Sequence, residues 1–243
     1  MKIIQSNLFN SIPEITFGLS TKSNQSSDDP FGFNLSFNIG DDEKRVLKNR
    51  EQFFNELGLT SEQVAYHYQM HGDTIKVVNE AGFVGESDAL VTTRKNLGLA
   101  ITTADCTTIF IYDRIGKIIS GVHSGWRGTT KNILGKTLKF IEKEFNSKPN
   151  DLLVYIAPSI SQKNYEVGEE VAEHFDPKYR KKHGDKFLLD VSAVNYDILI
   201  EHGIPENQIE KSTLCSFDSQ FLHSYRRDGN RSGRALGVIA MKE

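Results

Sequence analysis

The most informative part of the chain is residues 103–130, which read TADCTTIFIYDRIGKIISGVHSGWRGTT. Two apolar segments flank Asp113-Arg114-Ile115-Gly116, and a glycine close to an aspartate is typical of a tight antiparallel turn. If the two central residues form the loop, Cys106 lies directly opposite His123. A bulged turn with the glycine in the left-handed conformation would shift the pairing by one residue. Both registers predict a thiol and an imidazole near enough to hold one metal ion or to exchange a proton.

The positions of Cys106 and His123 in the chain favour a functional site over a core thiol. A buried free cysteine most often acts as a small apolar side chain. Here, however, Cys106 follows the polar residues 102–105, and His123 precedes the glycine-rich residues 124–128. Both side chains are therefore expected at strand ends, where loops meet and where binding and catalytic residues are commonly found.

The turn after His123 is a candidate anion site. Residues 124–129 read SGWRGT and lead into a predicted helix. Free backbone amides and the positive end of a helix dipole favour a phosphate or a carboxylate at such a place. Arg127 adds a planar guanidinium that can bind two anion oxygens. A glycine-rich segment before a helix can equally be an ordinary turn. The neighbouring Cys/His pair strengthens the interpretation as an anion site.

A tetrahedral zinc site with one open position needs a third protein ligand, and His71 is the favoured candidate. Gly72 allows the chain to turn at the entry of a predicted strand and to expose the imidazole. His67 lies in the same segment and is the weaker candidate. Three other histidines lie on or just after predicted helices beside charged residues and are interpreted as surface residues: His174, His183 and His202. Neither CxxC nor HExxH spacing is present, so spacing alone does not define the metal site.

Composition excludes several classes of protein. The 243 residues correspond to one large domain or two small ones, and we expect a single domain over residues 1–243. The 29 basic against 32 acidic residues argue against a dedicated nucleic-acid binder, and no apolar run approaches a membrane span. Two cysteines cannot form a disulfide framework, and the N-terminus lacks the pattern of a signal peptide, so we expect a cytoplasmic protein.

Hydrophobic periodicity predicts an α+β fold with mixed β-sheets flanked by helices. The predicted helices, bounded by capping aspartates or glycines in several cases, are 41–58, a segment centred on 133–145, 168–175 and 190–203. The predicted strands are 74–78, 88–93, 98–103, 106–112, 117–123, 152–156 and 235–241. Residues 21–30 are too polar to order themselves and are expected to form a surface loop.

Several motifs follow one another along the chain in an order that is similar to one protein family. The four most specific motifs are residues 69–72 (QMHG), 87–92 (SDALVT), 103–106 (TADC) and 123–129 (HSGWRGT). Shorter elements extend the similarity over nearly the whole chain: 34–35, 40–42, 49–50, 158–160, 165–168, 224–229 and 233–234. The sequence resembles the YfiH-type purine nucleoside phosphorylases, formerly known as polyphenol oxidase or laccase-domain proteins.

The resemblance implies a zinc site made by His71, Cys106 and His123, with Cu²⁺ as a possible alternative ion. It also implies phosphorolysis of adenosine, inosine and S-methyl-5′-thioadenosine, with adenosine deamination as a second activity. The partners would be a purine nucleoside and phosphate, without nucleic acid or membrane, in an unknown oligomeric state. The implied fold is of the CNF/YfiH type, which is similar to that of bacterial deamidase toxins.

The expected mechanism assigns provisional roles to further residues. Zinc would polarise an oxygen atom or activate a water molecule, which would attack C6 of adenine during deamination. Asp88 and Asp105 are the candidates for the carboxylate that transfers protons in that reaction. In phosphorolysis, phosphate would bind at the turn that contains Arg127 and attack C1′ of the ribose.

Substrate contacts are expected from aromatic and basic side chains. Trp126 or Tyr225 could stack on the purine, although each is at least as well explained as a packing residue. Arg50 is a further expected substrate-binding residue. The arginines near the C-terminus are candidates for anion binding and are equally consistent with a solvated or salt-bridged segment: Arg226, Arg227, Arg231 and Arg234.

Three other functions stay open at this point. Cys106 could be a nucleophile with His123 as its base, which would make the protein a metal-independent cysteine hydrolase. Copper could occupy a site of two histidines and one cysteine, but a multi-copper phenol oxidase needs more ligands than the seven histidines supply. A protein that binds a nucleotide without converting it is the last alternative, which an incubation with adenosine and phosphate would distinguish.

Overall fold

A cluster of aromatic rings joins two β-sheets face to face. The Phe17 ring lies 4.8 Å from that of Phe110 and 5.1 Å from that of Tyr155, and it also packs against Phe9 at 5.6 Å, all in edge-on orientations. Phe17 belongs to one sheet, whereas Phe110 and Tyr155 belong to the other. Burial of these rings between the sheets forms the central core of the computed structural model, which describes residues 2–22 and 29–243.

The first sheet has six strands and is mixed. Its members in spatial order are β1 (Ile3–Ile4), β2 (Ile15–Ser20), β15 (Ala235–Met241), β7 (Gly98–Thr103), β3 (Val64–Tyr68) and β5 (Gly82–Glu86). The pairs from β1 to β7 are antiparallel, whereas β3 runs parallel to both of its neighbours. Strand β15, from the end of the chain, thus pairs between two strands from the first half.

The second sheet also has six strands and is mixed. Its order is β14 (Ile209–Lys211), β10 (Leu152–Ile156), β8 (Thr107–Asp113), β9 (Ile118–Ser124), β6 (Ala89–Thr92) and β4 (Ile75–Val77). The four inner strands are antiparallel, and the two edge strands run parallel to their neighbours. A small third sheet consists of β11 (Glu166–Val167), β13 (Lys186–Leu189) and β12 (Arg180–His183).

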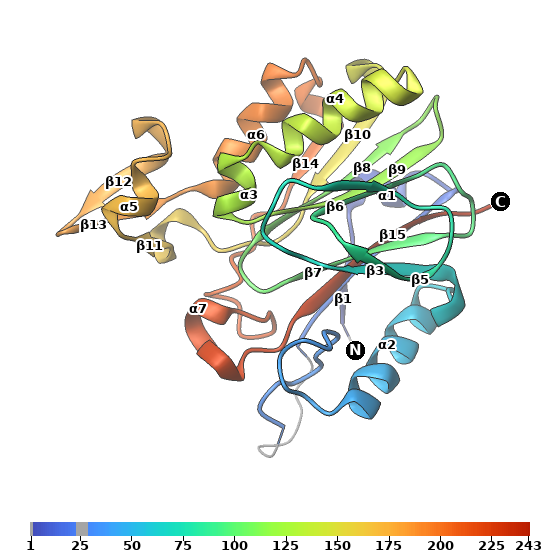
Figure 1. The fold of residues 1–243 in the computed structure, drawn as a ribbon, viewed down its shortest axis with the longest axis horizontal. Helices are drawn as coiled ribbons and strands as arrows, with labels where there is room; N and C mark the ends of the chain where they lie inside the picture. The colour runs from blue at the N-terminus through green and yellow to red at the C-terminus, as the bar shows by residue number, and fades with distance from the viewer. Residues whose placement is uncertain (1, 23–28) are drawn as a thin grey trace.

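Helices cover the outer faces of the two large sheets (Figure 1). Helix α2 (Glu43–Glu56) packs Phe53 and Phe54 against the first sheet. Helices α4 (Ile133–Phe145) and α6 (Val191–Glu201) cover the second sheet. The remaining helices are short: α1 (Asn7–Asn10), α3 (Trp126–Thr130), α5 (Glu169–Ala172) and α7 (Tyr225–Asp228). The predicted α+β class with mixed sheets flanked by helices is confirmed.

The predicted hairpin exists, but its predicted register is wrong. Strands β8 and β9 pair with Thr108 opposite His123, so Cys106, one residue before β8, is not directly opposite the imidazole. The observed pairing is shifted by two residues from the pairing expected with a two-residue loop. It is shifted by one residue from the pairing expected with a bulged turn. Because side chains alternate between the faces of a sheet, a shift of two leaves Cys106 and His123 on the same side of the hairpin.

The longer hairpin loop has a local cause. The carboxylate of Asp113 accepts hydrogen bonds from the amides of Ile115 (2.8 Å) and Gly116 (2.7 Å). Lys117, and not the glycine, takes the left-handed conformation, with φ of 52°. An Asx-type turn of this kind stabilises residues 114–117 as the loop in place of a two-residue turn.

Most other predicted elements are present with small differences at their ends. The capping side chain of Asp42 accepts a hydrogen bond at the start of α2, and Gly58 follows its end with φ of +69°. The helix predicted over 168–175 is shorter, because α5 covers only Glu169–Ala172. Strands β2, β3 and β5 were not predicted. Of the loop expected at 21–30, residues 23–28 lie outside the described residues. No helix in residues 2–22 and 29–243 has both the length and the apolar character needed to cross a membrane.

Candidate metal centre

Three side chains from separate parts of the chain converge where the two sheets end. They are His71 from the loop between β3 and β4, Cys106 just before β8, and His123 in β9. Their candidate ligand atoms all lie within 4.8 Å of one another, and the two imidazole rings stand at 83° with centroids 4.8 Å apart. The structure thus brings together the three residues expected as metal ligands. Two imidazole nitrogens and one sulfur in this arrangement could hold one metal ion.

The backbone that carries His71 is in an unusual conformation. His71 has φ of 55°, in the left-handed region that non-glycine residues rarely adopt. The carboxylate of Asp88 accepts hydrogen bonds from the amides of Met70 (3.2 Å), His71 (2.9 Å) and Gly72 (2.7 Å). These three bonds offset the cost of the strained residue, so Asp88 fixes the loop that presents the imidazole.

Asp88 also orients the second imidazole. Its Oδ1 atom lies 2.9 Å from Nδ1 of His123, and both side chains are almost completely buried. With Nδ1 engaged, His123 directs Nε2 toward the other ligands, as histidine ligands in metal sites typically do. Asp88 is fully buried and does not line the adjacent cavity. Its contacts therefore make it a positioning residue for His71 and His123.

The sulfur of Cys106 fits against a glycine. A β-carbon added at Gly125 would lie 2.9 Å from Sγ of Cys106 and 3.2 Å from Cδ2 of His71. Any side chain here would force two candidate ligands apart. The close approach of Cys106 and His71, both candidate metal ligands, therefore requires a glycine at position 125 of the predicted anion-binding turn.

The thiol and the buried imidazole stabilise each other's charged forms. Burial alone would raise the pKa of Cys106, but the charge and hydrogen bonding of His123 and His71 outweigh burial and lower it. Burial alone would lower the pKa of His123, yet the thiolate of Cys106 and the carboxylate of Asp88 raise it. Without a metal ion, these opposite pKa shifts favour a thiolate beside an imidazolium, and a cation that replaces the proton would find the sulfur more readily ionised.

A cavity of about 760 Å³ opens beside the three ligands. His71, Cys106 and His123 form part of its wall. Aromatic and hydrogen-bonding side chains complete the wall, among them Phe37, Tyr66, Phe83, Tyr225, Gln69 and Thr102. This volume and this mixed lining are typical of a site for a small organic ligand.

Two residues expected to bind substrate line this cavity. Arg50 places its guanidinium between two rings, 4.3 Å from the centroid of Phe37 and 4.5 Å from that of Tyr66. Tyr225 is half-exposed at the same cavity, and Arg234 lies 5.3 Å from its ring centroid. The structure therefore places both residues where they could contact a bound ligand.

Trp126 and Arg127 do not line the large cavity. The Trp126 ring stacks on His174 at 6.4 Å, and the exposed guanidinium of Arg127 lies 4.3 Å from the Trp126 centroid. Trp126 instead lines a separate space of about 30 Å³, together with Cys106 and Asp105. Helix α3 has only five residues, so it contributes little dipole to an anion. The phosphate site predicted at this turn stays a prediction.

Asp105 lies next to Cys106 but is occupied by structural hydrogen bonds. One carboxylate oxygen accepts from the hydroxyl of Ser216 at 2.6 Å, and the other accepts from the amide of Arg226 at 2.6 Å. Asp105 itself has φ of 90°. These bonds tie the loop before Cys106 to the C-terminal segment. Like Asp88, Asp105 does not line the large cavity, so the proton-transfer role predicted for the two carboxylates stays a prediction.

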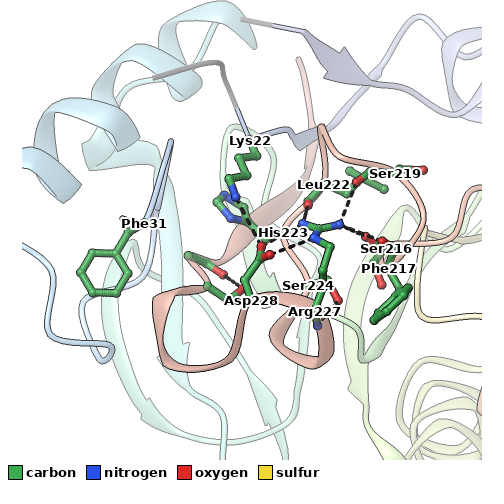
Figure 2. Close-up of polar contacts among 12 residues, drawn as sticks. Lys22, Phe31, Ser216, Phe217, Ser219, Leu222, His223, Ser224, Arg227 and Asp228 are labelled. Atoms are coloured by element: carbon green, nitrogen blue, oxygen red, sulfur yellow. Dashed lines mark hydrogen bonds and ion pairs between the residues drawn. The ribbon is translucent and has the colours of Figure 1, made fainter. Parts of the chain in front are cut away.

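The four C-terminal arginines separate into different roles. Figure 2 shows the guanidinium of Arg227 donating to the carbonyls of Ser216, Phe217, Ser219 and Leu222 and pairing with Asp228, which also contacts Lys22. Arg227 is therefore a structural residue. Arg226 donates to the carbonyl of Glu166, and Arg231 is exposed. Of the four, Arg234 lines the large cavity.

His67, the weaker candidate for the third ligand, lines the cavity and is not part of the metal-ligand cluster. Its Nδ1 lies 2.6 Å from the hydroxyl of Ser87, while its buried Nε2 has no hydrogen-bond partner among the described residues. Burial, followed by the charge of His123, lowers the pKa of His67 to about 4, so the ring is neutral near pH 7. Because strand β3 was not predicted, no sequence signal placed His67 beside the loop that carries His71.

Comparison with known proteins establishes the family. Residues 16–242 match the family model described as multi-copper polyphenol oxidoreductase laccase. The chain belongs to this laccase-like YfiH family. A relative from Corynebacterium glutamicum named purine nucleoside phosphorylase is 32% identical over 230 residues, covering 90% of this chain and 92% of its own. A relative of the same name from Bacteroides thetaiotaomicron is 31% identical, covering 85% and 84%.

Solved structures of YfiH-family proteins have the same fold. A protein described as hypothetical protein YfiH from Bacillus licheniformis superposes with a TM-score of 0.92 at 27% identity, covering 99% of this chain and 96% of its own. YlmD from Geobacillus stearothermophilus gives 0.90 at 27% identity, covering 98% and 94%. The YfiH-type fold implied by the resemblance is therefore confirmed.

The number of possible metal sites in this chain can be compared with the term multi-copper in the family description. Within residues 2–22 and 29–243, the cluster of His71, Cys106 and His123 is the one group of three or more His, Cys, Asp or Glu residues arranged to hold a metal ion. A multi-copper oxidase requires further sets of copper ligands. In this YfiH-family chain, the described residues support one metal ion beside one cavity.

Proposed function

We propose that the protein is a zinc-dependent purine nucleoside phosphorylase that acts on adenosine, inosine and S-methyl-5′-thioadenosine, with adenosine deamination as a second activity. The observation that carries the proposal is the position of the His71, Cys106 and His123 cluster in the wall of a cavity large enough for a nucleoside. The names of the YfiH-family relatives support the same reaction class.

The donor set fits zinc. Two neutral imidazoles and one thiolate are ligands that zinc accepts in catalytic sites, where three protein ligands leave one position open. Asp88 supports this set by fixing the His123 tautomer and the His71 loop. Zinc bound here would supply a Lewis acid that polarises an oxygen atom of water, phosphate or the ribose. Copper with the same ligands is the alternative that elemental analysis decides.

The cavity residues can bind a nucleoside without rearrangement of the fold. Tyr66, Phe83 and Tyr225 offer rings on which a purine can stack. The wall of the cavity at Gln69 offers hydrogen bonds to the base or the ribose. The side chain of Gln69 is itself fixed by two hydrogen bonds to the backbone of Thr102, at 2.7 and 2.9 Å.

The two reactions use the same bound nucleoside. In phosphorolysis, a phosphate oxygen forms a bond to C1′ while the bond from C1′ to the purine nitrogen breaks. The purine leaves with the electron pair of that bond and takes up a proton, and ribose 1-phosphate is the other product. In deamination, water adds at C6 and ammonia leaves, which converts adenosine to inosine.

A specific geometry also favours a second candidate function. Cys106, His123 and Asp88 form a thiolate, an imidazolium and an orienting carboxylate, which is the arrangement of a cysteine hydrolase. In that case the protein would act on acyl or amide bonds without metal. The open, aromatic-lined cavity and the third ligand His71 favour the metal-dependent reaction.

Product identification tests the proposal. Purified protein is incubated with adenosine, inosine or S-methyl-5′-thioadenosine, with and without inorganic phosphate, and the products are separated by liquid chromatography. The proposal predicts phosphate-dependent release of the free base and formation of inosine from adenosine without phosphate. If none of the three nucleosides is converted and iodoacetamide inactivates hydrolysis of an acyl substrate, the cysteine-hydrolase function replaces it.

A further inference from the structure

Two guanidinium groups face the large cavity without a carboxylate partner in the described part of the chain. They belong to Arg50 on α2 and Arg234 just before β15. No ion pair involves either side chain among residues 2–22 and 29–243. The cavity wall itself, as described, contains no aspartate or glutamate. Cys106 in the wall and Asp105 behind it attract Arg234 electrostatically, but among the described residues neither guanidinium forms a direct ion pair with an anionic group.

Arg50 is held rigidly with its terminal nitrogens available. The side chain is 5% exposed, its plane lies between Phe37 and Tyr66, and its Nε donates to the carbonyl of Leu35 at 2.8 Å. Neither terminal nitrogen has a hydrogen-bond partner among the described residues, and neither is sealed from solvent. The protein thus fixes the guanidinium through its Nε atom, and its two terminal nitrogens stay available to a ligand in the cavity.

Arg234 is hydrogen-bonded to Leu35, the same residue that binds Arg50. The amide of Leu35 donates to the carbonyl of Arg234 at 3.1 Å, while the carbonyl of Leu35 accepts from Arg50. The Nη1 atom of Arg234 donates to the carbonyls of Ser232 (2.7 Å) and Gly233 (3.1 Å), which leaves Nε and Nη2 free of described partners. Leu35 therefore bridges two segments that each bring one guanidinium to the cavity.

The energetics of this pair favour a bound anion. A buried cation without a counter-charge is costly, because burial removes its hydration. Burial lowers the pKa of Arg234, and the charge of Cys106 opposes that effect, so Arg234 also interacts electrostatically with the candidate metal ligand. Planar guanidinium groups match pairs of oxygen atoms on phosphate or carboxylate.

We propose that Arg50 and Arg234 form the oxyanion subsite of this cavity and bind the inorganic phosphate that attacks the nucleoside. This inference rests on the proposed function for the identity of the anion, but not for the existence of the subsite. It places phosphate beside the metal ligands and in the same cavity as the nucleoside. The alternative at Arg127 would place phosphate on an exposed side chain outside the wall of that cavity.

Phosphate chemistry at this subsite has two possible sources, free phosphate and the phosphate group of a nucleotide. The experiment therefore measures the binding of inorganic phosphate and of adenosine 5′-monophosphate separately, by calorimetry and by ³¹P line broadening. Both titrations use the full chain, once as purified and once after removal of metal by a chelator. Binding that persists after chelation belongs to the protein and not to a metal ion.

The matched variants are Arg50→Gln, Arg234→Gln and Lys48→Gln. Lys48 is exposed on the same helix as Arg50 and lies outside the cavity, so its variant removes one positive charge at the surface only. We expect each arginine variant to weaken phosphate binding by about tenfold or more, because each removes charge-assisted hydrogen bonds. We expect Lys48→Gln to change it by less than about twofold, as a screened surface charge should.

Steady-state kinetics give a second readout. The arginine variants should raise the KM for phosphate by about tenfold or more, with a smaller change in the KM for the nucleoside and an unchanged metal content. Circular dichroism checks that each variant is folded. If Arg50→Gln fails to fold because of its position between two rings, Arg234→Gln alone decides the outcome.

Unchanged phosphate binding in Arg234→Gln and in folded Arg50→Gln overturns the subsite, and so does an equal loss in Lys48→Gln. Nucleotide binding at least about tenfold tighter than phosphate, through the same arginines, overturns the assignment to free phosphate. Phosphate binding that depends on both arginines, in a protein that releases no base from any nucleoside, supports the subsite and contradicts the proposed function.

Discussion

The two cysteines of this protein have similar chemical states but different surroundings. Burial would raise the pKa of each thiol, and polar contacts lower both. At Cys106 the opposing groups are the imidazoles of His123 and His71. At Cys215 they are hydrogen bonds from Ser161, from the amide of Asp218 and from Asn164.

This difference separates a candidate metal ligand from a structural thiol. Imidazoles can bind a metal ion after they lose a proton, whereas hydroxyl and amide donors only satisfy the sulfur by hydrogen bonding. Cys106 also lines a large cavity, and Cys215 is 8% exposed and lines neither described cavity. A lowered thiol pKa therefore does not by itself distinguish a candidate metal site; the convergence of further candidate ligands beside open space does.

The largest expected effect comes from removing each thiol in turn. Cys106→Ala should lose bound metal and should reduce nucleoside conversion to the rate without protein, because one of three ligands is missing. Cys215→Ala should keep both. Elemental analysis and chromatography of the two variants measure this contrast. Retention of full activity by metal-free Cys106→Ala would break the distinction between the two cysteines.

A smaller effect is expected from the residue that orients the imidazoles. Asp88→Asn should weaken metal binding by about 10–100-fold, because it replaces one of the two accepting oxygens by an NH2 donor, which then faces either His123 or the amides of the His71 loop. Competition with a chromophoric chelator measures the affinity. The matched change at the other cysteine, Ser161→Ala, should leave the affinity unchanged. Equal affinities for wild type and Asp88→Asn would contradict the positioning role.

The reactivity of the two thiols should differ after chelation. Because its pKa is lowered, Cys106 keeps a thiolate population at pH 7, and that population falls only when the pH drops through the lowered pKa. We expect iodoacetamide to modify Cys106 at least about tenfold faster than the enclosed Cys215 at pH 7. Mass spectrometry of the peptides measures both rates. Added zinc should protect Cys106, and modification of Cys215 first would contradict the comparison.

The smallest expected effect concerns folding stability. Cys215→Ala should lower the free energy of unfolding by about 1–2 kcal/mol, because it leaves the donors of Ser161 and Asn164 without their acceptor. Urea unfolding followed by circular dichroism measures this change. A loss well above about 4 kcal/mol would indicate that the segment around Cys215 has a larger role in the core than its contacts suggest.

Local sequence signals predicted much of the fold. The capping residue Asp42 and the terminal Gly58 bounded α2, and the apolar runs around the 114–117 loop identified β8 and β9. The strands that were missed depend on distant partners. Strand β2 pairs with β15 across the length of the chain, and β3 contains polar residues that suit its position beside a cavity. Such pairings are set by tertiary packing, which one sequence does not reveal.

The candidate site shows the same division. Short motifs identified His71, Cys106 and His123, since each lies in a distinctive local sequence. The side of the hairpin on which the cavity opens could not be predicted, because it depends on how the loop at Leu35 packs against α2 and Arg234. This packing explains why Arg50 lines the cavity and the more conspicuous Arg127 does not.

The central claim is that one metal ion at the His71, Cys106 and His123 cluster enables phosphate-dependent cleavage of a purine nucleoside. The most direct measurement follows metal content and adenine release in one sample, before chelation, after chelation and after zinc is restored. The account predicts about one zinc per chain with phosphate-dependent release of adenine, loss of both on chelation, and recovery of both with zinc. Undiminished adenine release from the chelated, metal-free protein would contradict it.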